Sequence, residues 1–221
     1  MKPAFLMEFL NVPASRETEW NAWLDNTHLP ARLAVPGIFS IQRFIAIEGD
    51  RRYFNLLGLD DIGAISSERY LKPREAGISE ADASSSFVAM TATAPDILCG
   101  IYSQFYPQEE VYREPGAATI LVIGHDISPE HEDEYHAWYE TEHIPIHLQL
   151  PGFLHAYRFV AIQDELLPGN EVNGPKYITM YEVENETAFR TPEYEMSRQS
   201  PWTHWMRRFY TQCFRSIFRR M

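Results

Sequence analysis

The chain has 221 residues, of which 45% are hydrophobic and 23% charged, and its formal net charge is −12 at pH 7. This composition is that of a folded globular protein and excludes a disordered chain. The negative charge works against a phosphate-binding surface, so we expect no nucleic acid partner. No segment approaches the roughly 20 apolar residues that cross a bilayer, and Glu8 interrupts the N-terminal apolar run that a signal peptide needs. We therefore expect a cytoplasmic protein with no membrane partner.

A tandem repeat is the clearest feature of the sequence. A shift of 115 residues superimposes residues 17–47 on residues 132–162, and 13 of these 31 positions are identical. Unrelated segments of this composition would share roughly two. Between the copies, Pro107 and Pro115 interrupt the apolar pattern. The repeat predicts two halves, residues 1–106 and 116–221, joined by a linker at residues 107–115.

The hydrophobic period changes in the same order in both halves, which predicts the elements β, α, β, β, then a mixed, partly helical stretch and a final strand. The strands are expected at 5–10, 38–47, 53–57 and 98–106 in the first half, and at 118–123, 153–163, 177–181 and 212–218 in the second. The mixed stretches are 66–93 and 187–208. A βαββαβ unit is a ferredoxin-like half whose sheet has helices on one face only. We therefore predict an α+β fold in which two ferredoxin-like repeats pack sheet to sheet as one intramolecular barrel.

The first helix of each half has an aromatic face at the spacing i, i+3, i+4, which predicts burial against a sheet. The residues are Trp20, Trp23 and Leu24 in the first half, and Tyr135, Trp138 and Tyr139 in the second. Pro30 and Pro145 disfavour helical backbone at the residue before them. We therefore expect each helix to end or kink near His28 and His143.

The sequence after each helix has a recognisable pattern. It reads Trp-Leu-Asp-Asn-Thr-His-Leu-Pro-Ala-Arg-Leu-Ala-Val-Pro-Gly-Ile at 23–38 and Trp-Tyr-Glu-Thr-Glu-His-Ile-Pro-Ile-His-Leu-Gln-Leu-Pro-Gly-Phe at 138–153. Both strings resemble the helix-to-strand signature of EthD-like members of the dimeric α+β barrel superfamily. The resemblance implies the barrel architecture. Because that superfamily includes cofactor-free monooxygenases, isomerases, polyketide cyclase-like and dehydratase-like enzymes, haem enzymes and proteins without known activity, the fold does not settle the function.

Both halves have a carboxylate three residues before a histidine, Asp25 with His28 and Glu140 with His143. On an α-helix this spacing places both groups on one face. A carboxylate beside an imidazole fixes its tautomer and raises its pKa, which suits a general acid or base near neutral pH. The alternative is that the two histidines hydrogen-bond the carbonyls left open where the helix ends.

The second half also has a histidine-rich stripe that resembles a metal site, formed by His136, Glu140, His143 and His147. Pro145 interrupts the helix within this stripe, and the first half has Asn21, Asp25, His28 and Arg32 at the same positions, an ordinary polar stripe. We therefore predict no metal site and no cofactor. Haem bound through His143 or His155 is the alternative, because the superfamily includes haem proteins.

The strand after each Pro-Gly pair alternates between two faces. One face reads Ile38, Ser40, Gln42 and Phe44 in the first half, and Phe153, His155, Tyr157 and Phe159 in the second. Aromatic walls with a few polar groups are typical of a ligand cavity, so we predict that this face lines one. The third strands add Asn55 and Tyr181 as candidates. Arg43 and Arg158 lie on the other face, where an ion pair to a helix carboxylate is expected.

Seven of the eight histidines follow the linker, which favours a working site in the second half. We predict a cofactor-independent proton-transfer enzyme, an isomerase, lyase or monooxygenase, that acts on a small apolar, aromatic or polyketide-like molecule. The predicted catalytic residues are His143, Glu140, His155 and Tyr157, and the predicted substrate-binding residues are His28, Asp25, Asn55, Tyr181 and Gln42. The alternatives are a non-catalytic ligand-binding barrel and a haem enzyme. Aromatic residues at 202–210 also offer a surface through which two chains could pair as a homodimer.

Overall fold

The computed structural model describes residues 3–67, 70, 97–162 and 173–221. Their contacts divide the chain into two compact units. The first comprises Met1–Ile45, Arg51–Ser103 and Ala161–Gly174, and the second Ala46–Asp50, Gln104–Val160 and Pro175–Met221. Each unit is thus built mainly from one half of the sequence, while two short segments cluster with the opposite half.

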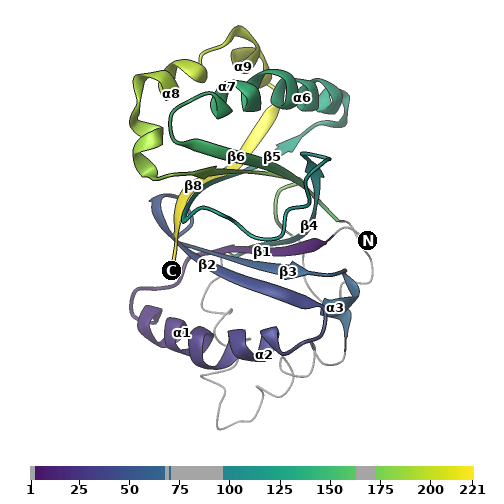
Figure 1. Cartoon of the computed structure of the whole chain (residues 1–221), viewed down its shortest axis with the longest axis vertical. Helices are drawn as coiled ribbons and strands as arrows, with labels where there is room; N and C mark the ends of the chain where they lie inside the picture. The colour runs from purple at the N-terminus through teal and green to yellow at the C-terminus, as the bar shows by residue number, and fades with distance from the viewer. Residues whose placement is uncertain (1–2, 68–69, 71–96, 163–172) are drawn as a thin grey trace. The chain divides into compact units, whose positions relative to one another are not determined.

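The first unit contains an antiparallel sheet and a helical segment (Figure 1). Its elements are β1 (Ala4–Leu10), α1 (Glu17–Trp23), η1 (Leu24–His28), α2 (Leu29–Leu33), β2 (Ile38–Gly49), β3 (Tyr53–Leu59), α3 (Gly63–Ser66) and β4 (Leu98–Tyr106). Strand β1 pairs with β4 and β3, and β3 pairs with β2, which gives the order β4-β1-β3-β2. Most of the predicted mixed stretch at 66–93 lies outside the described residues.

The second unit has the same order of strands. Its elements are β5 (Thr119–Ile127), η2 (Pro129–His131), α6 (Glu132–Trp138), η3 (Tyr139–His143), α7 (Ile144–Leu148), β6 (Phe153–Ala161), β7 (Tyr177–Val183), η4 (Glu186–Arg190), α8 (Pro192–Ser197), α9 (Pro201–Met206) and β8 (Tyr210–Arg220). The antiparallel pairs give the order β8-β5-β7-β6. Helices α6, α7, α8 and α9 cover one face of this sheet (Figure 1). No helix within the described parts of the chain is long and apolar enough to span a membrane.

The predicted aromatic faces of the first helices are buried. In the second unit, Tyr135, Trp138 and Tyr139 are at most 1% exposed and belong to one large core cluster with strand residues of β5, β6, β7 and β8. In the first unit, Trp20 and Leu24 are buried against Tyr53 and neighbouring residues. Trp23 of the same predicted face is only half-buried. The helical spacing therefore predicted the core correctly at the other five positions, because i, i+3, i+4 positions share one face.

Each helix was expected to end or kink near His28 and His143, and the structure has an irregularity there and no helix end. Each continues through a π-turn, η1 or η3, into a further α-helical turn. The N–H of Ile144, for example, donates to the carbonyl of Tyr139, five residues earlier. The proline that follows lies in the first turn of the next α-segment, where its missing N–H is tolerated. Single π-turns within helices occur frequently at functional sites.

A β-bulge follows each Pro-Gly turn, where Gly37 and Gly152 have φ values of +90° and +83° that suit glycine. The register shifts between Ile38 and Ser40 in β2 and between Phe153 and His155 in β6. An inserted residue breaks the alternation of faces. Phe153 therefore packs in the core under the helices, and the predicted common face of Phe153 and Tyr157 is wrong.

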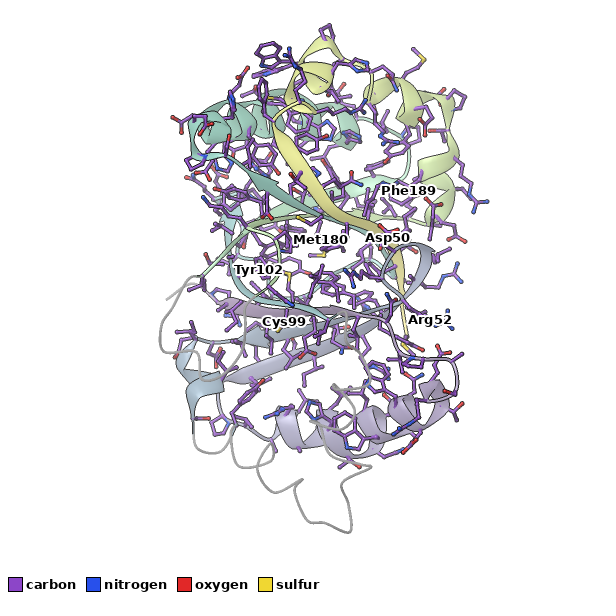
Figure 2. The ribbon with its side chains drawn as sticks, turned by 180° about the vertical axis from the view of Figure 1, so that it is seen from behind. Asp50, Arg52, Cys99, Tyr102, Met180 and Phe189 are labelled. Atoms are coloured by element: carbon purple, nitrogen blue, oxygen red, sulfur yellow. The ribbon has the colours of Figure 1, made fainter. Side chains whose placement is uncertain are left out.

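The face of the second sheet that lies opposite the helices is covered by the linker. The Gln104 amide donates to the carbonyl of Pro107 and accepts from the N–H of Tyr112. The Tyr112 ring lies 4.6 Å from the Tyr157 ring, and its hydroxyl contacts the sulfur of Met180 at 3.8 Å. Met180 is labelled in Figure 2. The linker thus packs on the second sheet through the buried Tyr112, while most of its other residues are exposed.

Candidate active site

A cavity of about 70 Å³ lies between the helices and the sheet of the second unit. Its walls come from β5, β7 and β8 on the sheet side and from α6, η3, α7, α8 and α9 on the other. Because one ordered water needs roughly 10–15 Å³, there is room for several waters or for one end of a larger molecule. The cavity thus offers a site for a small reacting group.

His143, the last residue of the π-turn, is part of the cavity wall. Its ring lies against the ring of Trp138 at 4.3 Å and is edge-on to those of Tyr139 and His147, at 5.2 and 4.3 Å. Its Nδ1 is buried and has no hydrogen-bond partner among the described residues. Because more than nine in ten buried polar groups in proteins are paired, this nitrogen is available to a water or to a ligand in the cavity.

Two further buried polar atoms of the cavity wall are unpaired in the described structure, Nε2 of His125 on β5 and the hydroxyl of Tyr181 on β7. The other nitrogen of His125, Nδ1, lies 3.0 Å from the hydroxyl of Tyr135 and 3.4 Å from that of Tyr139. These contacts fix the orientation of the His125 ring. The site therefore presents three polar groups that a ligand could satisfy.

The histidines of the cavity are neutral at pH 7. Burial lowers the pKa of His125 to about 3 and that of His147 to about 4. Burial also lowers the pKa of His143, and the neighbouring His147, His125, Arg198 and Arg207 lower it further. A neutral imidazole can accept a proton, which is the first requirement for a general base.

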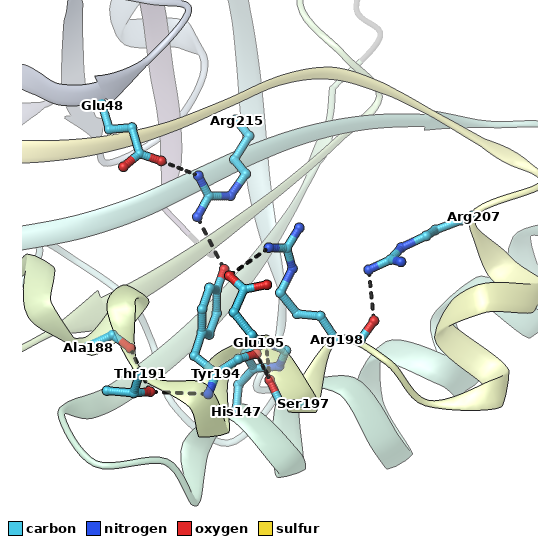
Figure 3. A network of polar contacts seen from close by, with 10 residues as sticks. All are labelled: Glu48, His147, Ala188, Thr191, Tyr194, Glu195, Ser197, Arg198, Arg207 and Arg215. Carbon is cyan, nitrogen blue, oxygen red and sulfur yellow. Dashed lines mark hydrogen bonds and ion pairs between the residues drawn. The ribbon is translucent and has the colours of Figure 1, made fainter.

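Three arginines, Arg198, Arg207 and Arg215, also line the cavity. Figure 3 shows their partners. Arg215 lies 3.2 Å from a carboxylate oxygen of Glu48 and donates to the Tyr194 hydroxyl at 3.2 Å. Arg198 lies 3.7 Å from a carboxylate oxygen of Glu195. Arg207 donates to the carbonyl of Arg198 at 2.8 Å.

The carboxylates of the two predicted carboxylate–histidine pairs contact arginines of the neighbouring strands. Glu140 accepts from Arg158 at 3.1 Å, and Asp25 accepts from Arg43 at 2.5 Å. The reason is the π-turn, because its hydrogen bonds span five residues and its wider turn rotates residues three apart onto different faces. The predicted ion pairs of Arg43 and Arg158 with helix carboxylates are therefore confirmed, and Glu140 and Asp25 serve the packing of helix on strand.

Further contacts bear on the capping alternative and on the histidine stripe of the second half. His147, and not His143, donates to a helix carbonyl, from Nδ1 to the oxygen of His143 at 2.6 Å. His136 contacts Arg158 at 3.0 Å on the side of Glu140, whereas His143 and His147 line the cavity. Within the described part of the chain, no group of three or more His, Cys, Asp or Glu could hold a metal ion.

The other predicted residues of the strands lie elsewhere. His155 is exposed on β6. Tyr157 lies on the face opposite the helices, where its hydroxyl donates to Glu110 at 2.8 Å and where burial and Glu110 raise its pKa. Gln42 is half-buried on β2, opposite Leu56. None of these three predicted residues lines the cavity of the second unit, whereas the predicted Tyr181 does.

The first unit has a smaller cavity of about 20 Å³ at the same place in its fold. Trp23, His28 and Asn55 are among its lining residues, and the rings of Trp23 and His28 stack at 4.6 Å. Asn55 donates to the carboxylate of Glu8 at 3.2 Å. The tryptophan–histidine pair therefore recurs in both units, with more free volume in the second.

Comparison of the two cavities shows further site residues that were not predicted from the sequence. Where the repeat places leucine in the first half, the second half has a polar residue: Leu10 corresponds to His125, Leu24 to Tyr139 and Leu57 to Tyr181. These replacements were visible in the aligned repeat. His125 and the three arginines were not among the predicted site residues.

A protein-family model described as a domain of unknown function, DUF4286, matches residues 118–214. This segment contains His125, His143 and Tyr181. It also includes Arg198 and Arg207, while Arg215 follows it directly. No curated protein matches the chain.

Solved structures match nearly the whole chain. An anthrone oxidase-like protein has a TM-score of 0.63 at 9% identity, over 99% of this chain and 91% of its own. A haem-binding protein from Thermus thermophilus has a TM-score of 0.56 at 12% identity, over 100% and 91%. A mutant chlorite dismutase from Candidatus Nitrospira defluvii in complex with cyanide has a TM-score of 0.58 at 11% identity, over 99% and 90%.

These structural relatives are of the dimeric α+β barrel type. Their identities are far below those that carry a function from one protein to another, so the similarity shows the fold alone. The chain therefore has a mixed fold of the dimeric α+β barrel type. The fold does not determine the reaction, so the residues of the cavity are the basis for any proposed function.

Proposed function

We propose that the second unit is a cofactor-independent enzyme that removes a proton from a small aromatic or polyketide-like molecule. The observation that carries this proposal is the unpaired, neutral imidazole of His143 at the wall of a cavity that also holds three arginines. Isomerases, lyases and cofactor-free monooxygenases can all begin with removal of a proton beside a carbonyl or from a phenol. His143 is the proposed base.

In the proposed step, the C–H bond beside a substrate carbonyl breaks and its proton passes to His143. The electron pair moves to the carbonyl oxygen, which becomes an enolate. His125 Nε2 and the Tyr181 hydroxyl are available to hydrogen-bond this oxygen, and the arginines favour the developing negative charge. Because burial makes the free His143 a weak base, negative charge on the substrate would strengthen it.

The repeated sequence pattern and the order of the elements support a more specific family assignment. We propose that the two halves are duplicated ferredoxin-like units of the EthD-like group, on the basis of the repeated helix-to-strand pattern and the common order β, α, β, β. The first half then serves mainly as scaffold, since its smaller cavity has leucines at the positions of His125, Tyr139 and Tyr181. The anthrone oxidase-like structure supports an aromatic substrate, one end of which would enter the cavity.

Haem does not fit the described cavity, although two of the similar proteins suggest it. A porphyrin needs a pocket in the range of several hundred Å³, whereas this cavity measures about 70 Å³. The space around His143 is filled by the rings of Trp138, Tyr139 and His147. The proposed step therefore uses no haem.

Deuterium exchange tests the proposed function. The purified protein is incubated in D₂O with a panel of anthrones, naphthols and aromatic ketones, and NMR follows the exchange of activated C–H protons while an electrode follows oxygen uptake. We expect protein-dependent exchange with at least one compound, and oxygen uptake in addition if the enzyme is a monooxygenase. Compounds that raise the melting temperature without exchange would instead support a non-catalytic binding protein. A stoichiometric Soret band after incubation with hemin would contradict the proposal of a cofactor-independent enzyme.

A further inference from the structure

The charge of the second-unit cavity is opposite to that of the protein. The chain has a formal net charge of −12, yet the described cavity wall has three arginines and no aspartate or glutamate. The arginines come from the C-terminal end of α8, the turn after α9 and β8, so the fold assembles them from separate segments. Such a concentration of guanidinium groups in a partly enclosed cavity favours an anionic ligand.

The partners of the arginines set the charge of that ligand. Arg215 and Arg198 each have a carboxylate within ion-pair distance, Glu48 at 3.2 Å and Glu195 at 3.7 Å. For Arg207, the described residues provide a carbonyl and no carboxylate. Arg207, which is exposed to solvent, is therefore the arginine of the three that has no carboxylate partner among the described residues. A single such cation matches a monoanion better than a phosphate ester with about −1.5 to −2 charges at pH 7.

The unpaired groups of the wall are consistent with a ligand that has more than one oxygen. Tyr181 has a free hydroxyl, and His125 has a free Nε2. In the tautomer in which Tyr135 donates to Nδ1 of His125, the neutral ring has its proton on Nε2, which is then a donor. Donors on several sides of the cavity suit a carboxylic acid that also has a carbonyl or hydroxyl group.

We propose that the second-unit cavity binds a small organic carboxylate, with Arg207 as the principal cation and Arg198 beside it, so that the substrate of the enzyme is an acid. This inference rests on the proposed function for the identity of the reaction, but the recognition itself can be measured without it. Leu121, Ile123 and Trp138 form the apolar part of the same wall and accommodate the carbon skeleton. The substrate class is thus an aromatic or unsaturated carboxylic acid.

Binding of matched probes tests the proposal on the full-length protein. Calorimetry compares benzoate with benzamide and acetate with acetamide, pairs of similar shape that differ in charge, and includes inorganic phosphate. At least one carboxylate should bind about tenfold or more tightly than its amide. Arg207→Gln should reduce that ratio to near one. Arg208→Gln is the matched control, because Arg208 packs on Trp205 and Phe209 and does not line the cavity, and it should keep the ratio.

Any of four results would overturn the proposal. In the unmodified protein, these are a carboxylate-to-amide ratio near one, binding of none of the probes, and tighter binding of phosphate than of either carboxylate. The fourth is an equal loss of the ratio in Arg208→Gln. His143→Gln separates recognition from chemistry, since it should keep the preference for carboxylates while proton exchange falls. A retained preference without any exchange would remove the proposed reaction and leave the carboxylate site. Exchange without the preference would remove the carboxylate site and leave the reaction.

Discussion

Replacing His143 by glutamine should lower the rate of proton exchange about a hundredfold or more, which is the usual contribution of a positioned general base. Glutamine can still form hydrogen bonds and has a similar volume, but it cannot accept a proton near neutral pH. The NMR exchange assay measures the rate with the best compound of the panel. The melting temperature of the variant shows that the fold is intact.

Two variants serve as controls for this experiment. His28→Gln changes the same position of the repeat in the first unit, and Glu140→Gln changes the carboxylate that contacts Arg158 instead of His143. Both should keep the exchange rate within about threefold of the unmodified protein. If Glu140→Gln lost as much as His143→Gln, the carboxylate–histidine pair would act in catalysis after all. If His143→Gln lost nothing, another group would be the base.

Replacing Trp138 by alanine should lower the free energy of unfolding by about 3–5 kcal/mol, the usual loss for a large aromatic residue in a core. Trp138 is 1% exposed, packs against Tyr135 and Tyr139, and donates from Nε1 to the hydroxyl of Thr203 at 3.2 Å. Urea unfolding followed by far-ultraviolet circular dichroism measures the change. Such a loss is a large part of the stability of a typical protein.

Trp23→Ala is the matched control, because Trp23 occupies the same position in the first unit but is only half-buried. We expect a clearly smaller loss there, since less apolar surface returns to water. An unchanged urea midpoint for Trp138→Ala would show that the aromatic face of α6 contributes little to stability. Equal losses at both positions would contradict the assignment of different burial to the two tryptophans.

The sequence predicted the order of the elements and the cores because both follow from periodicity. The spacing of Tyr135, Trp138 and Tyr139 is that of one helical face, and these residues are buried as expected. The predicted strand at residues 98–106 has the bounds of β4. The ion pairs of Arg43 and Arg158 were also predictable, because a buried guanidinium on a strand needs a carboxylate from the helix above it.

Two departures from regular backbone geometry explain why Glu140 and Tyr157 do not lie where the sequence predicted them. A π-turn has no simple sequence signal, so the helical wheel placed Glu140 beside His143, whereas Glu140 contacts Arg158. The bulge in β6 likewise shifted the alternation of faces, so Tyr157 was assigned to the same face as Phe153. One residue of register is enough to move a side chain to the other face of a sheet.

The arginines could not be placed together from the sequence because they lie on segments whose packing depends on the whole second unit. A bulge in β8, where His125 pairs with Gln212 and Gly124 with Phe214, brings Gln212 and Arg215 to the same cavity. The repeat did offer one usable signal for the site. Leu10 and Leu57 correspond to His125 and Tyr181, and such polar replacements at buried positions of one copy indicate a function specific to that copy.

The position of a bound carboxylate is the most direct test of the central claim that the cavity under the helices of the second unit is the working site. A crystal structure of the protein with benzoate, or with the best compound of the panel, would locate it. We predict density in the second-unit cavity, with a carboxylate oxygen within hydrogen-bond distance of Arg207 and the carbon skeleton between Trp138 and His143. A ligand beside Tyr157 and Glu110, on the opposite face of the sheet, would contradict the account.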